Sequence, residues 1–266
     1  MHPIVNIAIR AARQAGTVIT RASNRMDSLN IQTKSPNDFV SEVDRQAEDE
    51  IIQTIRKAFP DHSILAEESG EHSAGDEFQW IIDPLDGTTN FLHQFPQYSV
   101  SIAVKQRGRL EHAVVFDPLK DEIFSASRGA GAQLNGRRLR VSKANGLEGA
   151  LLGTGIPFKN QRYLDLYLQM LKTMVIPSAG IRRAGSAALD LAYVASGRLD
   201  GFWELDLKPW DMAAGILLIQ EAGGMVSDIN GGHEIFETGH IIAANPKVFK
   251  AMVQALHPYA TEIQGL

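Results

Sequence analysis

The chain has 266 residues, no cysteine, 44% hydrophobic residues and a formal net charge of −5. The absence of cysteine excludes thiol catalysis, disulfides and thiolate metal sites, and the acidic balance argues against a broad nucleic-acid-binding surface. The length suits one large domain or two fused subdomains.

The N-terminus and the apolar segments give no sign of export or of a membrane span. Residues 1–7 lack a basic region followed by an apolar core, so no signal peptide is expected. No apolar run reaches about 18 residues, the length that crosses a bilayer. We therefore expect a cytoplasmic protein that does not enter a membrane.

The first half, residues 1–145, is predicted to be an α+β unit. Apolar residues at helical spacing predict helices over residues 3–22 and 43–59, and a loop that ends at residues 34–38 separates them. Strand-like segments at hairpin spacing follow the second helix, over residues 63–66, 78–82, 98–104, 110–116 and 122–126. These segments predict an antiparallel sheet.

The second half, residues 146–266, is predicted to be an α/β unit because strands and helices alternate along it. Strand-like segments cover residues 150–154, 199–204, 225–228 and 240–244. Helical patterns cover residues 163–174, 186–196, 211–222 and 247–256. Asp211 is expected to cap the third of these helices. No linker-like stretch separates the halves, so we expect one compact body with two packed sheets.

The most informative motif is an apolar strand that runs into two aspartates and a Gly-Thr-Thr turn, over residues 80–91. Asp83 and Asp86 offer hard oxygen ligands, which suit Mg²⁺ better than Zn²⁺. Gly87 and Thr88 supply backbone N–H groups and a hydroxyl, which suit a phosphate group. A metal site beside a phosphate-binding turn implies chemistry on a phosphate ester.

Four further acidic residues lie at predicted element boundaries, where a side chain can project into a cleft: Asp44, Glu67, Glu68 and Asp211. Each of them also has a purely structural interpretation. Asp44 and Asp211 could be plain helix N-caps, and the two glutamates could be a solvated pair. The residues alone leave these alternatives open, as they do a simple turn for the aspartate motif.

Three motifs carry a resemblance to a known family: Glu67-Glu68-Ser69, the run over residues 80–91, and the run Pro-Trp-Asp-Met-Ala-Ala-Gly over residues 209–215. Through them the whole chain resembles the inositol monophosphatase family, and in particular its bacterial inositol-1-monophosphatase branch. The resemblance implies a five-layered αβαβα sandwich and a Mg²⁺-dependent, lithium-sensitive phosphatase.

The resemblance also implies a role for each matching position. The metal ligands it implies are Glu67, Asp83 and the Leu85 carbonyl for a first Mg²⁺, Asp83, Asp86 and Asp211 for a second, and Glu67 for a weaker third. The catalytic groups it implies are Glu67 and the pair that orients the attacking water, Asp44 and Thr88. The substrate is expected on Gly87, Thr88, Gly185, Ser186, Ala187, Glu204 and Asp211, with Arg182 or Arg183 just before this pocket.

The implied reaction is the hydrolysis of inositol monophosphate to inositol and phosphate, by in-line attack of a metal-activated water. Two ions about 3.5–4 Å apart can clamp the attacking and leaving oxygens. A carboxylate shared between the ions, as expected of Asp83, fixes their separation. Another small phosphomonoester is the alternative substrate. A homodimer is expected because the family commonly forms one.

A different function is also implied, because the branch resembles the accessory Nus-type factors of ribosomal RNA transcription antitermination. In that role the chain would bind antitermination factors or RNA polymerase through its surface. The chain offers two short basic runs in support, over residues 137–140 and 182–183. A charge run is more often a solvated surface, so the residues favour the enzyme.

Overall fold

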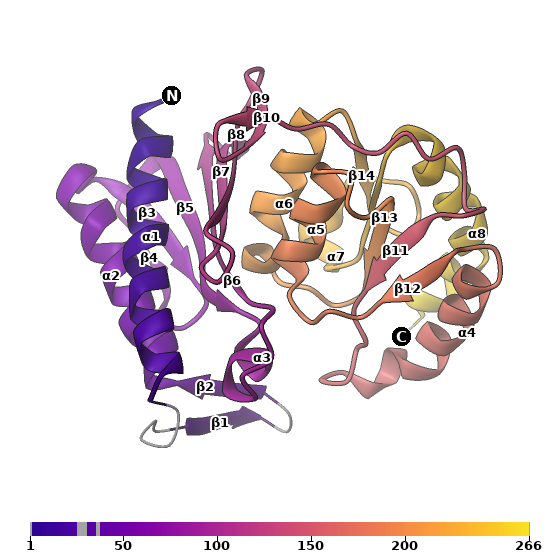
Figure 1. The fold of residues 1–266 in the computed structure, drawn as a ribbon, viewed down its shortest axis with the longest axis horizontal. Helices are drawn as coiled ribbons and strands as arrows, with labels where there is room; N and C mark the ends of the chain where they lie inside the picture. Colours follow the sequence, from indigo (N-terminus) through magenta and orange to yellow (C-terminus); the bar gives the residue numbers. More distant parts are fainter. Residues whose placement is uncertain (1, 26–30, 36–37, 266) are drawn as a thin grey trace.

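Two large β-sheets alternate with three pairs of helices, so that the described residues form a five-layered αβαβα sandwich (Figure 1). The computed structural model describes residues 2–25, 31–35 and 38–265. The helix pairs, in order across the molecule, are α1 (Pro3–Ser23) with α2 (Glu42–Ala58), α5 (Ala187–Ala195) with α6 (Pro209–Glu221), and α4 (Leu164–Val175) with α8 (Pro246–Gln264). The predicted fold class is confirmed.

The helices α1 and α2 cover one face of the first sheet because each has an apolar stripe at helical spacing. The buried residues of the stripes include Ala8, Ala11, Ala15 and Ile19 in α1, and Val43, Ala47, Ile51 and Ile55 in α2. These side chains and one face of the sheet form a continuous apolar core.

The first sheet has eight strands and is mostly antiparallel. In spatial order they are β10 (Arg137–Arg138), β9 (Gly131–Leu134), β8 (Glu122–Ser127), β7 (Arg109–Asp117), β6 (Ser99–Gln106), β5 (Gly75–Asp86), β3 (His62–Ala66) and β4 (Gly70–His72). The strands β3 and β5 run parallel. Helices cover both faces of the sheet, so residues 99–104 of β6 are all buried.

The second sheet has five strands. In spatial order they are β12 (Gly180–Arg182), β11 (Leu151–Thr154), β13 (Gly201–Glu204), β15 (Ile241–Ala244) and β14 (Met225–Ser227). The strand β11 runs parallel to both of its neighbours, and β15 runs antiparallel to both of its own. The outer helices α4 and α8 pack on this sheet around the buried Trp203.

The helices α5 and α6 are enclosed between the two sheets. Residues 212–219 of α6 are all buried, which explains why this helix has no polar face. One apolar core contains side chains of both helices and of both sheets, such as Ile81 and Val115 from the first sheet and Phe202 and Ala243 from the second. The middle layer therefore joins the two halves.

Some elements differ from the expectation. The segment predicted as a loop contains a two-stranded sheet of β1 (Ile31–Ser35) and β2 (Asp38–Ser41), and residues 26–30 and 36–37 of that prediction lie outside the described part of the chain. Asp211 is not the N-cap residue of α6, because the helix begins at Pro209 and Lys208 is the N-cap. From the first turn, however, the Asp211 carboxylate still caps the helix by accepting the Lys208 N–H. Proline suits the first helical position, where its missing N–H has no partner to lose.

Several boundaries and short elements complete the picture. The strands β4 and β12 and the short helix α7 (Ile235–Thr238) are additions to the predicted elements, and α8 continues beyond its predicted end. The proposed division near residue 145 falls between the last strand of one sheet and the first strand of the other, and it stays a prediction. None of the described helices is long and apolar enough to cross a membrane.

Candidate metal and phosphate site

The aspartate motif lies at the end of β5, where pairing with β6 is irregular. The register between the two strands shifts between Asp83 and Asp86, with Pro84 and Leu85 in between. Proline has no N–H to donate to a sheet, which favours such a break. The Leu85 N–H donates instead to the Asp83 carboxylate, at 3.0 Å. The local sequence therefore presents two carboxylates at a fixed irregularity of the strand.

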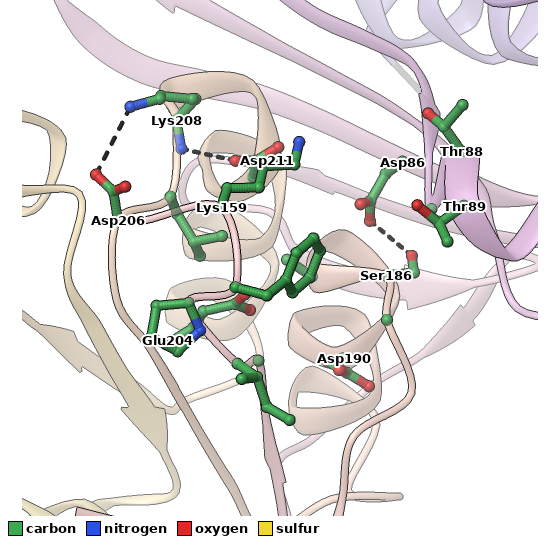
Figure 2. A pocket seen from close by; sticks show the side chains of 18 of the residues that line it. Asp86, Thr88, Thr89, Lys159, Ser186, Asp190, Glu204, Asp206, Lys208 and Asp211 are labelled. Carbon is green, nitrogen blue, oxygen red and sulfur yellow. Dashed lines mark hydrogen bonds and ion pairs between the residues drawn. The ribbon is translucent and has the colours of Figure 1, made fainter. Parts of the chain in front are cut away.

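Three aspartates converge at this point. Carboxylate oxygens of Asp83, Asp86 and Asp211 all lie within 4.8 Å of one another. Asp211 comes from the first turn of α6, and Figure 2 shows it on the opposite side of the pocket from Asp86 and Thr88. Glu67 follows β3, and its N–H donates to the carbonyl of Ile82, the neighbour of Asp83, at 3.1 Å.

The clustered carboxylates raise one another's pKa. Burial places the pKa of Asp83 well above its ordinary range, and the charges of Glu67, Asp86 and Asp211 raise it further. Burial also raises the pKa of Asp86 to about 6 and that of Asp211 to about 7. So much negative charge in a buried place is unfavourable unless protons or cations neutralise it.

Asp86 is held by the start of α5. Its Oδ2 accepts a hydrogen bond from the Ser186 hydroxyl at 2.6 Å (Figure 2). It accepts another from the Ala188 N–H at 2.8 Å. Ser186 is the N-cap of this helix. These donors favour the ionised carboxylate and so oppose the effect of burial on the pKa. A side chain of the first sheet is thereby tied to the middle helix layer.

Gly87 turns the chain from β5 into the short helix α3 (Thr88–Leu92). Its φ is +97°, a conformation that glycine adopts without strain. A Cβ at this position would lie 2.9 Å from the Gln97 carbonyl oxygen and 3.3 Å from the Gly185 carbonyl oxygen. Glycine is required here both for the backbone angle and for the close approach of the loop that contains Gly185.

Thr88 connects this turn with α2. Its hydroxyl lies 3.0 Å from Asp44 Oδ1 and 3.1 Å from the Leu85 carbonyl oxygen, and it can donate to either. Asp44 is buried in the first turn of α2. The two residues expected to orient water therefore lie together, next to a carbonyl expected to bind metal, and their catalytic roles stay predictions.

A cleft of about 710 Å³ extends from the aspartates to the second half of the chain. The expected site residues that line it are Glu67, Asp83, Leu85, Asp86, Gly87, Thr88, Gly185, Ser186, Ala187, Glu204 and Asp211. The described residues of its wall include no histidine. Carboxylate and carbonyl oxygens are the donors that Mg²⁺ prefers, so this set fits a magnesium site.

Glu204 is the last residue of β13 and packs against Gly155. A Cβ on Gly155 would overlap the Glu204 carboxylate, so glycine makes room for it. Burial raises the pKa of Glu204 to about 8, against the opposing charge of Arg183. At neutral pH the protonated form therefore prevails, and this carboxylic acid can donate a hydrogen bond.

Of the two neighbouring arginines, Arg183 lines the cleft and Arg182 does not. Arg182 is the exposed last residue of β12, and its Nη1 donates to the Ile181 carbonyl at 3.2 Å. The structure therefore does not bring Arg182 to this cleft, and its part in substrate binding stays a prediction. Successive side chains of an extended chain point to opposite sides, so the two arginines cannot both face the cleft.

Four further charged residues line the cleft without belonging to any motif, namely Lys159, Asp190, Asp206 and Lys208. Asp190 is buried in α5, one helical turn after Ser186, and burial raises its pKa well above the ordinary range. Residues four apart share a helix face, so the spacing from Ser186 was a usable signal for Asp190. Lys159 lies in the loop after β11, where no pattern in the sequence marks it.

Comparisons with known proteins place the whole chain in one family. The model of the inositol monophosphatase family matches residues 1–261. The Nus factor SuhB of Pseudomonas aeruginosa is 57% identical over 264 residues, which cover 97% of each chain. The extragenic suppressor protein suhB of Bartonella henselae superposes with a TM-score of 0.94 at 44% identity, over 96% of this chain and 98% of the other. An inositol monophosphatase from Anabaena superposes with a TM-score of 0.85 at 38% identity, over 96% of this chain and 95% of the other. The chain therefore belongs to the inositol monophosphatase family.

Proposed function

We propose that the chain hydrolyses a small phosphomonoester with Mg²⁺ as its cofactor, and that inositol monophosphate is its substrate. The observation that carries this proposal is the convergence of Asp83, Asp86 and Asp211 beside the turn at Gly87 and Thr88. An oxygen-donor cluster next to backbone N–H groups suits a phosphate ester held between metal and turn. Membership of the inositol monophosphatase family supports the same reaction.

The residues that would hold two to three Mg²⁺ ions are Glu67, Asp83, the Leu85 carbonyl, Asp86 and Asp211. Bound Mg²⁺ would offset the charge of the phosphate and acidify a water molecule. The protein's part is to hold these oxygens on a strand irregularity and a helix turn that are already formed. The aspartates must lose their protons to bind a cation, so protons and Mg²⁺ compete for them.

Thr88 and Asp44 would orient the attacking water. When the Thr88 hydroxyl donates to Asp44 Oδ1, its oxygen keeps lone pairs that can accept a hydrogen bond from water in the cleft. The water proton can then move to Thr88 Oγ1 while the hydroxyl proton moves to Asp44. General base assistance of this kind needs only groups in hydrogen-bond reach.

The alcohol part of the substrate would lie toward Glu204. Its protonated carboxyl can donate to a hydroxyl oxygen of a polyol, because the pKa of Glu204 lies at about 8. The Ser186 hydroxyl already donates to Asp86, so toward the substrate Ser186 acts as an acceptor. This pairing of one donor and one acceptor suits a polyol such as inositol.

Asp211→Asn tests the metal assignment. An asparagine oxygen can still accept the hydrogen bond that Asp211 Oδ2 receives from the Lys208 N–H at 2.6 Å, but the charge needed by a cation is gone. Phosphate release from inositol 1-phosphate should fall by orders of magnitude, and half-maximal rate should need more Mg²⁺. Asp165→Asn, in the first turn of α4, is the matched control and should leave both unchanged.

The same experiment can reject the assignment. A near-normal rate of the Asp211→Asn protein at saturating Mg²⁺ would contradict it. A change confined to the melting temperature would leave helix capping as the role of Asp211. Lithium inhibition and a homodimer belong to the same proposal, and rate measurements with Li⁺ and light scattering of the purified protein test them.

A second function is supported by a separate observation, the 57% identity with a protein named Nus factor SuhB. We propose that this chain also binds the transcription machinery as an accessory antitermination factor. Purified elongation complexes should retain the wild-type chain and, if the two functions are separate, the Asp211→Asn chain equally. Failure of both to bind would reject this role, and loss of binding in the variant alone would link it to the metal site.

A further inference from the structure

Arg183 lies at the wall of the cleft without an ion-pair partner among the described residues. Its guanidinium carbon lies 5.4 Å from the centre of the Phe158 ring. Stacking on an aromatic ring occupies the flat face of a guanidinium and leaves the N–H groups on its edge available. An arginine in this state is a receptor for a planar or tetrahedral oxyanion.

The surrounding loop holds Arg183 close to the pocket. A Cβ on Gly185 would lie 2.5 Å from Arg183 Nη1, so glycine allows the guanidinium to lie over this loop. The loop itself is fixed by Asn90, whose Nδ2 donates to the Ala184 carbonyl at 2.9 Å and to the Gln97 carbonyl at 2.7 Å. The position of Arg183 is therefore set by a ring on one side and by an anchored backbone on the other.

Arg183 acts electrostatically on two acids of the cleft wall that are not among the expected metal ligands. These acids are Glu204 and Asp190. Burial raises the pKa of both acids, and the charge of Arg183 opposes this effect. The positive charge of Lys159, by contrast, acts on Asp86 and Asp211 as well as on Glu204.

We infer that Arg183 is a specificity-determining residue that binds a second oxyanion, a phosphate or a carboxylate, on the alcohol part of the substrate. This inference rests on the proposed phosphatase function and extends its substrates beyond inositol monophosphate, which lacks a second anionic group, to phosphomonoesters that carry one. The phosphate that is cleaved lies at the aspartates, and the second oxyanion lies on the edge of the guanidinium. A cleft of about 710 Å³ is within the range of pockets that enclose whole small ligands, so both groups have room.

The test compares substrates that differ by one anionic group. Glycerol 2-phosphate is paired with 2-phosphoglycerate, which adds a carboxylate, and inositol 1-phosphate is paired with inositol 1,4-bisphosphate, which adds a phosphate. Arg183→Ala should lower kcat/KM for the two-anion substrates by about tenfold or more, mainly through KM, as expected for a lost charge-assisted pair. The one-anion substrates should change by less than about twofold.

Two further variants separate charge from geometry. Arg183→Lys keeps the charge without the planar fork and should fall between wild type and Arg183→Ala. Arg182→Ala removes the neighbouring arginine, which lies outside the cleft, and should leave the preference between the paired substrates unchanged. If Arg183→Lys restored the full preference for two-anion substrates, the effect would be one of charge alone. This result would overturn the inference that the guanidinium binds the second oxyanion in a fixed orientation.

Calorimetric titration of each substrate into the Mg²⁺-loaded protein supplies a readout that does not need turnover. Equal losses on both substrate classes, or no preference for the two-anion substrates in wild-type binding, would overturn the inference. If the wild-type chain released phosphate from none of the four compounds, the proposed function would fail. Tighter binding of the two-anion compounds that disappears in Arg183→Ala would still support the role of Arg183.

Discussion

Asp86 and Asp211 differ in how many hydrogen bonds stabilise their charged form. Asp86 accepts from the Ser186 hydroxyl and from backbone N–H groups at the start of α5, whereas Asp211 accepts from the Lys208 N–H. The pKa of Asp86 rises to about 6, and that of Asp211 to about 7. Hydrogen bonds from Ser186 and Ala188 oppose the effect of burial on the pKa of Asp86. The charges of Asp86 and Glu204, by contrast, add to the effect of burial on the pKa of Asp211.

Ser186→Ala should show what these donors contribute. The change removes the 2.6 Å hydrogen bond to Asp86 and the N-cap of α5, which together should lower the free energy of unfolding by about 1–2 kcal/mol. The pKa of Asp86 should rise further, so half-maximal activity should need more Mg²⁺. Urea unfolding and a Mg²⁺ titration of phosphate release measure the two effects.

Ser196→Ala is the matched control, because Ser196 lies at the other end of the same helix and its hydroxyl donates to the Tyr193 carbonyl. It should leave the Mg²⁺ requirement unchanged. An unchanged Mg²⁺ requirement in Ser186→Ala as well would mean that the serine caps the helix and does not tune the aspartate.

At the scale of elements, the turn between β5 and α3 depends on one glycine. Gly87→Ala should reduce both stability and turnover, because alanine is strained at a φ of +97° and its Cβ would press on the Gln97 carbonyl. Gly108→Ala is the matched control, since Gly108 has a φ of +78° and open space where a Cβ would lie. Both variants should lose about 1–2 kcal/mol to backbone strain, measured by urea unfolding.

The two glycine variants should differ in activity. Gly87→Ala displaces the turn that would bind phosphate, so its kcat should fall by at least about tenfold, whereas Gly108→Ala should retain the wild-type kcat. Equal kcat values in the two proteins would show that the turn does not position the phosphate.

The elements that could be predicted from the sequence are those with a strong local pattern. The helices α1 and α2 have clear apolar stripes. The aspartate motif directly follows an apolar run, so the end of this strand can be predicted from the local sequence alone. The strand β12 is only three residues long and partly exposed, so its sequence has no alternation of apolar and polar residues that would predict a strand. Because the sequence does not predict β12, it also does not indicate which of Arg182 and Arg183 faces the cleft. The hydrogen bond between Asp86 and Ser186 joins residues 100 positions apart, so no local sequence pattern predicts it either.

At the scale of the whole molecule, the buried acids should make stability depend on Mg²⁺ and pH together. The pKa values of Asp86 and Asp211 in the folded chain, about 6 and about 7, lie above the ordinary value of 3.8. A carboxyl with a raised folded pKa stabilises most below its unfolded pKa, and this contribution is lost as the pH rises through the folded pKa. Without metal, this contribution should therefore decline between about pH 4 and pH 7.

Melting temperatures with Mg²⁺ and with a chelator test this linkage. The gain from Mg²⁺ should be larger at pH 7.5 than at pH 5.5, because protons occupy the carboxylates at the lower pH and a ligand of the folded state stabilises it by mass action. The gain should shrink in Asp211→Asn. Equal gains at both pH values, or none at either, would contradict a cation site built from these acids.

The shared middle layer limits how the chain can be divided. Cutting the backbone between β10 and β11 would leave α5 and α6 on the C-terminal fragment. Their apolar side chains that pack on the first sheet would then be exposed to water. The N-terminal fragment would expose the apolar face of the first sheet that packs on these helices. Each fragment produced alone should aggregate through its exposed apolar surface. When both fragments are produced in one cell, they should bind each other and reassemble, because each fragment covers the apolar surface of the other.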